Sequence, residues 1–240
     1  MSYKKSLYAY VACVLLIAYV AVFFYPKWEN KGTESSLGWD AGTYYWYLPA
    51  TFIYKDLKQQ KFGDSIINKY QFTPSFVQSF VYKQGNRVIT YSSGVALVQL
   101  PAFVIAHLLA EPLGYDADGF SLPYQFAIQL WAICIGIAGL WFFRKLLLLF
   151  YSDAVVAVLL VMLVAGTCFL NYTAIDATLT HCPLFAIYAL LLLNTQYYYT
   201  SPKRKYAIRI GLLTGLAILI RPSEIIAVLL PMLWGMENLS

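Results

Sequence analysis

The chain has few charged residues, because Asp, Glu, Lys and Arg together make up only 12% of its 240 positions. Histidine is also scarce, and the four cysteines do not follow the spacing of a zinc site. The sequence contains no glycine-rich phosphate loop and no Gly-x-Ser-x-Gly element. These absences leave nucleotide-driven pumping, zinc hydrolysis and serine hydrolase chemistry without support.

Apolar residues, in contrast, are abundant. Hydrophobic residues account for 60% of the chain and aromatic residues for 18%, and the mean hydropathy is +0.60. Several uncharged runs approach the roughly 20 residues needed to cross an apolar bilayer core about 30 Å thick. We therefore expect an integral membrane protein. The net charge of +5 comes largely from lysines and arginines that flank these runs, so it does not indicate nucleic-acid binding.

The first apolar run covers residues 6–25 and follows Lys4 and Lys5, which predicts a spanning helix entered from the cytoplasm. A cleaved signal peptide is the alternative. A signal peptide would have a shorter apolar core than this run. It would also have small residues before its cleavage site, where this chain has Phe23 and Phe24.

The positive-inside bias orders the remaining runs. They are residues 91–110, 125–143, 154–172, 183–199, 206–220 and 224–235. If the short basic segments 4–5, 144–145 and 203–205 are all cytoplasmic, an even number of crossings separates each pair. Run 91–110, which contains Pro101, breaks this parity if it spans, so we interpret it as an interfacial or half-embedded helix. The predicted fold is all-α and polytopic, with about six spanning helices plus juxtamembrane helices in a long first outer loop.

The chain divides into three parts on this interpretation. Residues 1–25 form the first transmembrane helix, residues 26–123 the outer region with juxtamembrane helices, and residues 124–240 a transmembrane helical bundle. Because about six spans make a small bundle and the sequence stops soon after a helix, at Trp234-Gly235-Met236-Glu237, we expect the amino-terminal module of a longer protein.

Two segments of the outer region have distinct patterns. Residues 41–57 predict an amphipathic surface helix, whose aromatic side chains are more typical of a membrane-interface anchor than of a sugar platform. Residues 59–90 mix turn signals with β-forming residues at 87–90, which indicates turns and a small hairpin.

Three polar residues share the predicted outer face: Asp40, Asp176 and His181. Asp40 lies about fifteen residues beyond the first span and is a candidate catalytic base, because a carboxylate at the membrane surface can meet a lipid-borne substrate. Its alternative role is to cap a helix starting at Ala41, and Asp176 has the same alternative before Ala177. The alternative for His181 is an interfacial polar residue.

Four short elements follow one another in a recognisable order. They are Gly38-Trp39-Asp40 after the first span, Tyr91-Ser92-Ser93-Gly94 with Pro101 opening a juxtamembrane helix, Asp176 in the second outer loop, and Gly215-Leu216-Ala217 leading to Arg221-Pro222. In this order they resemble the glycosyltransferase C superfamily, in particular its lipid A aminoarabinose transferase and protein O-mannosyltransferase-like members. Trp39-Asp40, residues 115–120 and residues 123–125 also resemble Bacteroidetes-type membrane proteins to which no reaction is assigned.

The resemblance implies an inverting glycosyltransferase of the bacterial inner membrane. Such an enzyme transfers a sugar from a polyprenyl-phosphate donor to a glycan, lipid or protein acceptor on the periplasmic face. Asp40 matches the first-loop aspartate and would take the acceptor's proton. Asp176 matches a second acidic position, which orients the acceptor or helps to bind a metal. The sequence requires no cofactor, and a divalent cation would need Asp40, Asp176 and His181 to converge through tertiary structure.

The leaving phosphate needs positive charge, and here the chain departs from the resemblance. The family often has a basic residue at the start of its juxtamembrane helix, whereas Tyr91 and Ser92 offer only hydroxyl groups. Arg87 or Arg221 would then supply the charge. Tyr44 and His181 complete the predicted substrate-binding residues.

The main competing hypothesis is a non-catalytic membrane protein, such as a lipid-linked glycan flippase, a transporter or a scaffold. An inactive fragment is a second competitor. Transporters place ionisable residues near the bilayer midplane, whereas the acids of this chain cluster at one predicted surface. That distribution favours chemistry at the surface.

Overall fold

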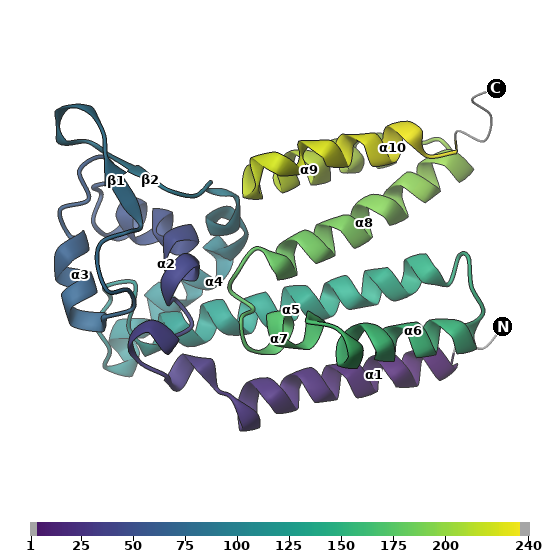
Figure 1. The fold of residues 1–240 in the computed structure, drawn as a ribbon, viewed down its shortest axis with the longest axis horizontal. Helices are drawn as coiled ribbons and strands as arrows, with labels where there is room; N and C mark the ends of the chain where they lie inside the picture. Colours follow the sequence, from purple (N-terminus) through teal and green to yellow (C-terminus); the bar gives the residue numbers. More distant parts are fainter. Residues whose placement is uncertain (1–3, 236–240) are drawn as a thin grey trace.

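The computed structural model describes residues 4–235 and consists of long helices joined to an outer region of short elements (Figure 1). Met236 and Glu237, which entered the expectation about the end of the chain, lie outside the described residues. The long helices are α1 (Lys4–Tyr19), α5 (Leu122–Leu147), α6 (Asp153–Gly166), α8 (His181–Thr200) and α9 (Arg204–Ile220). Helix makes up 72% of the structure, so the predicted helical class is confirmed.

Three stretches of the described chain are long and apolar enough to cross a membrane: Lys4–Glu29, Gly94–Leu113 and Leu122–Leu147. This is fewer than the six spans expected. The predicted run 154–172 is divided, because α6 ends at Gly166 and the extended backbone of Thr167 separates it from α7 (Phe169–Ala174). Helix α9 has only 17 residues.

The ends of the long helices carry different charges. The start of α1, the turn between α5 and α6 and the turn between α8 and α9 lie at one end of the molecule, on the right in Figure 1. The basic segments 4–5, 144–145 and 203–205 belong to these places. The outer region lies at the opposite end. All three short basic segments therefore share one end, as the positive-inside arrangement requires.

A polar junction ties α1, α5 and α6 together at the basic end. The Asp153 carboxylate accepts hydrogen bonds from the backbone N–H of Lys5 at 2.9 Å and from the Ser6 hydroxyl at 2.5 Å. The Arg144 Nε donates to the same hydroxyl at 2.9 Å. Asp153 thereby satisfies a free N–H group in the first turn of α1, where the helix dipole favours negative charge.

The outer region contains short helices, a hairpin and α4. Its elements are η2 (Lys27–Glu29), η3 (Gly32–Glu34), α2 (Trp39–Tyr45), η4 (Pro49–Ile53), α3 (Gly63–Tyr70), β1 (Ser79–Val81), η5 (Lys83–Gly85), β2 (Arg87–Ile89), α4 (Gly94–Ala110) and η6 (Glu111–Leu113). The antiparallel pairing of Ser79 with Ile89 confirms the predicted hairpin. Since two strands pair here, the all-α description is corrected to a helical fold with one small sheet.

The remaining segments complete the long-helix part. The π-helix η1 (Val20–Phe24) continues α1, and η7 (Pro222–Val228) with α10 (Leu229–Leu233) follows α9. Glu224 in η7 accepts a hydrogen bond from the Tyr188 hydroxyl of α8. This hydrogen bond holds η7 to α8.

Residues 41–50 of the aromatic segment after Asp40 are mostly buried, which corrects the prediction of a surface helix for this part of residues 41–57. Residues 51–57 are exposed or half-buried. Tyr45 and Trp46 are 0% exposed. The Tyr45 hydroxyl donates to the Gly119 carbonyl at 2.6 Å, and the Trp46 Nε1 donates to Gln60 Oε1 at 2.9 Å. The predicted helix also divides into α2 and η4, since Pro49 has no N–H to continue it. These rings form the core of the outer region and are not membrane anchors.

The loop between α4 and α5 joins α3 to this core. Asp118 accepts hydrogen bonds from the backbone N–H of Phe120 at 3.0 Å, from the Lys69 ammonium at 2.6 Å and from the Tyr70 hydroxyl at 2.6 Å. Lys69 also bonds Asp116 at 2.7 Å. A single lysine therefore bridges the two carboxylates of this loop.

Helix α4 connects the two parts of the molecule. The Trp131 Nε1 of α5 donates to the Val98 carbonyl of α4 at 2.8 Å, and His107 Nδ1 lies 2.6 Å from the Tyr124 hydroxyl. By length and composition α4 with η6 matches a membrane span. It packs on the first half of α5 and beside α2, at the end of the molecule that carries the hairpin (Figure 1).

Candidate functional site

Asp40 lies in the first turn of α2, and the chain reaches it through a tightly packed turn. Gly38 precedes the helix, and a Cβ added there would lie 2.2 Å from the Thr33 carbonyl oxygen. Trp39 adopts a left-handed backbone with φ of 50°, and its N–H donates to the Phe72 carbonyl at 3.1 Å. Because Asp40 is inside the helix, its predicted role as the cap before Ala41 is wrong. Its carboxylate is exposed.

Tyr91 joins Asp40 to the aromatic core. Its ring stacks on Tyr44, with centroids 4.4 Å apart and planes 17° apart. The Tyr47 hydroxyl donates to the Tyr91 carbonyl at 2.7 Å. Burial, followed by a hydrogen bond to the Asp40 carboxylate and the charge of that group, raises the pKa of Tyr91 to about 12. Tyr91 is therefore a neutral hydrogen-bond donor to Asp40 at physiological pH.

Arg221 reaches the same place from the end of α9. The start of α4 packs directly on that end, since a Cβ added at Gly94 would lie 2.4 Å from the Ile220 backbone nitrogen. The positive charge of Arg221 acts on Tyr91, where it opposes the effect of Asp40. Within residues 4–235 the half-buried guanidinium of Arg221 forms no ion pair and no side-chain hydrogen bond. It is a cation available to an anionic ligand.

His181, at the start of α8, and Asp176, in the loop before it, are the next predicted site residues, and they lie on the side of Arg221. The His181 ring contacts the Tyr172 ring with centroids 3.9 Å apart, and the charges of Arg221 and Asp176 both act on it. Asp176 itself forms an ion pair with Lys27 of η2 and accepts a hydrogen bond from Asn171 at 2.9 Å. Its charge is thus balanced within the protein, and the pair fastens η2 to the loop before α8.

The capping role considered for Asp176 is wrong, because no helix starts at Ala177. Residues 175–180 form turns and bends, and α8 begins at His181. The Asp176 carbonyl instead accepts the Leu179 N–H at 3.3 Å.

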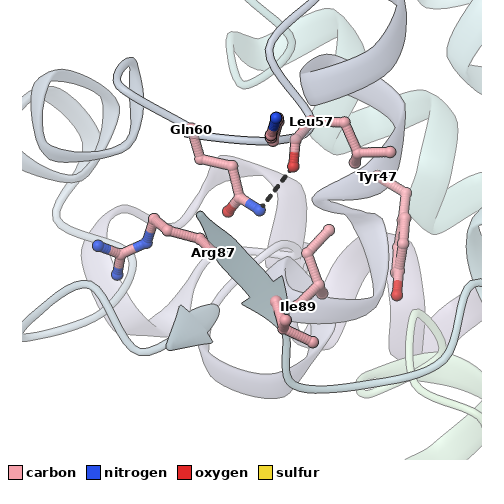
Figure 2. Close-up of a pocket in the computed structure, with 7 residues that line it drawn as sticks. Tyr47, Leu57, Gln60, Arg87 and Ile89 are labelled. Atoms are coloured by element: carbon pink, nitrogen blue, oxygen red, sulfur yellow. Dashed lines mark hydrogen bonds between the residues drawn. The ribbon is translucent and has the colours of Figure 1, made fainter. Parts of the chain in front are cut away.

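Arg87 and Ser92 occupy different surroundings. Ser92 is half-buried in the loop between Tyr91 and α4. The guanidinium of Arg87 donates twice to Ser79 at 2.9 Å and stacks 3.9 Å from the centre of the Phe76 ring. Figure 2 shows it pointing away from Tyr47, across a cavity of about 350 Å³. Of the two candidate cations, Arg221 is the one close to Tyr91, and Arg87 belongs to the hairpin.

Buried glutamines, to which the sequence analysis gave no role at the site, hold the segments around it. The amide of Gln99 donates to the Thr178 carbonyl at 3.2 Å, and the amide of Gln129 donates to the Ile175 carbonyl at 2.8 Å. Gln125 accepts the Leu37 N–H at 2.9 Å. Polar side chains inside otherwise apolar helices were the available signal, because such groups are costly to bury without a partner.

A shared cation site is not formed by the acidic residues and histidines. Among residues 4–235 no group of three or more His, Cys, Asp or Glu side chains is arranged to hold a metal ion. Asp40, Asp176 and His181 therefore do not converge in the way that a common metal site requires.

No family model, no curated protein and no solved structure matches the chain. The arrangement contains an exposed carboxylate with a phenol donor, and a half-buried guanidinium without a partner in the described chain.

Proposed function

We propose that this protein is a membrane glycosyltransferase, which transfers a sugar from a polyprenyl-phosphate donor to an acceptor with inversion at the anomeric carbon. The observation that carries the proposal is that Tyr91 stacks on Tyr44 of α2, the helix of Asp40, and packs against the cluster that contains Ile220, the residue before Arg221. A general base and an anion-binding cation beside one another are the two groups that this reaction needs.

The reaction assigns a separate role to each residue. Asp40 takes the proton of the acceptor hydroxyl while the oxygen of that hydroxyl bonds to the anomeric carbon of the donor sugar. The bond from that carbon to the phosphate oxygen breaks, and its electron pair stays on the phosphate. Arg221 offsets the negative charge that grows there. Tyr91 is a positioning residue, because its hydroxyl holds the Asp40 carboxylate.

The proposed membrane arrangement places this chemistry on the outer face. In it, about six helices span the bacterial inner membrane, α4 lies at the interface, and the short basic segments are cytoplasmic. Arg221 then follows a span directly and stands at the level of lipid headgroups. A lipid-borne donor could present its phosphate there without leaving the bilayer.

The experiment is a transfer assay with radiolabelled polyprenyl-phosphate sugars in membranes that contain the full-length protein. We expect transfer from at least one donor above membranes without the protein. Arg221→Gln should raise the donor concentration that gives half-maximal rate by about tenfold or more, through loss of a charge-assisted hydrogen bond. Arg209→Gln, at an exposed position of the same helix, should leave it unchanged.

Absence of transfer from every donor by the wild-type protein would contradict the proposal and favour a flippase or transporter. Transfer with an unchanged donor dependence in Arg221→Gln would remove this residue from the phosphate site.

A further inference from the structure

A cavity of about 490 Å³ lies in the outer region, and Asp40, Tyr91 and Arg221 do not line it. It is bounded by η2 and η3, the end of α3 and the start of α5. Its volume is within the roughly 300–1,000 Å³ of small-molecule sites. This cavity has no part in the reaction proposed above.

Three aromatic side chains form apolar walls of the cavity: Trp28, Tyr70 and Phe120. Trp28 is held edge-on against Phe126, with ring centroids 5.4 Å apart, and Phe120 stacks on Phe72 at 5.2 Å. The negative face of an aromatic ring attracts the positively polarised C–H groups of a sugar ring. Rings that are fixed by their neighbours lose little side-chain entropy on binding.

A buried hydroxyl group on the cavity wall lacks a partner. Ser35 is 4% exposed, and its Oγ has no hydrogen-bond partner within the described residues. Buried polar side chains are nearly always hydrogen-bonded. A rotation of the Ser35 side chain toward the cavity would let a hydroxyl-bearing ligand supply the missing bond.

The charges around the cavity do not favour an anion. Lys69 is neutralised by Asp116 and Asp118, at 2.7 and 2.6 Å. The remaining charged residues of the wall, Glu29 and Lys31, have opposite signs. Asn30 and Gln125 add amide groups, which serve as both donors and acceptors. Aromatic walls, neutral polar groups and balanced charge together match an uncharged polyhydroxylated ligand.

We propose that this cavity is a saccharide-binding site, separate from the Asp40 group, which consists of Asp40, Tyr91 and Arg221. It takes a neutral sugar unit, whose apolar side packs on Trp28 and whose hydroxyl bonds Ser35. Because η2 directly follows the first apolar stretch and α5 begins another, the site adjoins the predicted membrane surface. A free saccharide and the sugar headgroup of a glycolipid present the same chemistry to it.

The test is saturation-transfer NMR of the full-length protein in phospholipid nanodiscs, with methyl glycosides of glucose, mannose, galactose and N-acetylglucosamine as probes. We expect binding of at least one glycoside. Trp28→Ala should weaken it by about tenfold and Ser35→Ala by about fivefold. Asp64→Asn, which removes a carboxylate of α3 that does not line the cavity, should bind the glycoside like the wild type.

Two controls keep the result interpretable. Trp28→Phe preserves a ring and should retain most of the binding, which distinguishes loss of the platform from loss of the fold. Ser35→Ala leaves no known hydrogen-bond partner behind, so a purely structural Ser35 predicts unchanged affinity.

A second experiment adds to the nanodiscs a glycolipid whose headgroup is the sugar of the glycoside that binds. Competition with the free glycoside identifies a lipid as one source, and binding of the free glycoside alone identifies a soluble saccharide. The inference is overturned if no glycoside binds, or if binding is the same in Trp28→Ala and Ser35→Ala as in the wild type.

Discussion

At the scale of single residues, the Asp40 carboxylate takes its place from neighbours that are far away in the sequence. The close approach of Gly38 to Thr33 and the left-handed backbone of Trp39 fix the start of α2. The Asp40 carboxylate in turn acts on the Tyr91 hydroxyl and contributes to its raised pKa.

Tyr91 should keep its phenolic proton to about pH 12 in the folded protein, compared with about 10 for an ordinary tyrosine. Since the folded state binds this proton more tightly, the associated stability is complete below pH 10 and is lost as the pH rises through 12. Asp40→Asn should lower the pKa of Tyr91, but not to 10, because burial is the larger cause. The Cζ chemical shift of labelled tyrosine reports this titration.

Tyr91→Phe identifies the resonance by its disappearance. A pKa of Tyr91 that is the same in Asp40→Asn and in the wild type would show that the two groups do not interact.

The sequence alone supplied candidate residues for the site but not the contacts between them. Asp40 and Arg221 were both expected, and the structure brings both to Tyr91. The ion pair of Asp176 with Lys27 was not foreseen, because it joins residues 149 positions apart and no local pattern records it. Arg87 looked equally suitable in the sequence, but the hairpin turns it toward Ser79.

At the scale of secondary structure elements, the contact between the start of α4 and the end of α9 brings Tyr91 and Arg221 together. Gly94 makes this contact possible, because a side chain there would collide with the Leu219 and Ile220 backbone. Backbone atoms cannot move aside in the way that a flexible side chain can.

Gly94→Ala should therefore lower the free energy of unfolding by about 1–3 kcal/mol, as overpacking does, and should move Arg221 away from Tyr91. The matched control is Gly215→Ala, within α9, where an added Cβ meets no atom within 4 Å. That change should be neutral or stabilising by up to about 1 kcal/mol, because alanine is the better helix former. Denaturation in detergent measures both, and equal effects would contradict the proposed contact.

The sequence patterns predicted some elements correctly and others not. The β-forming residues at 87–90 gave the hairpin, since its turn signals are local. The aromatic segment 41–57 was mistaken for a surface helix, because aromatic residues are equally common at membrane interfaces and in buried cores. Only its packing on residues as distant as Gly119 separates the two cases.

At the scale of the whole molecule, the short basic segments lie at one end and the Asp40 group lies toward the other (Figure 1). This polarity was predictable, because the charge bias acts on short loops that the sequence shows directly. The number of spans was not. Three helices of the described chain are long and apolar enough to span, and one of them, α4 with η6, belongs to the run 91–110 that we interpreted as interfacial. The ends of the shorter helices depend on tertiary contacts.

The predicted orientation can be tested by cysteine labelling in a variant whose four native cysteines are replaced by serine. Ser65→Cys lies in α3 of the outer region, and Ser201→Cys lies in the turn between α8 and α9. A membrane-impermeant maleimide should label Ser65→Cys in intact spheroplasts and Ser201→Cys only after permeabilisation. The reverse pattern would place Asp40 on the cytoplasmic face and would rule out a periplasmic reaction.

The most direct measurement of the central claim is the rate of sugar transfer by Asp40→Asn, compared with the wild type at matched expression. Loss of a general base should lower the rate by about 100- to 10,000-fold. Asp64→Asn, which removes an exposed carboxylate from α3, is the matched control and should keep the wild-type rate. If Asp40→Asn also transfers sugar at the wild-type rate, Asp40 is not the base and the account of this site is wrong.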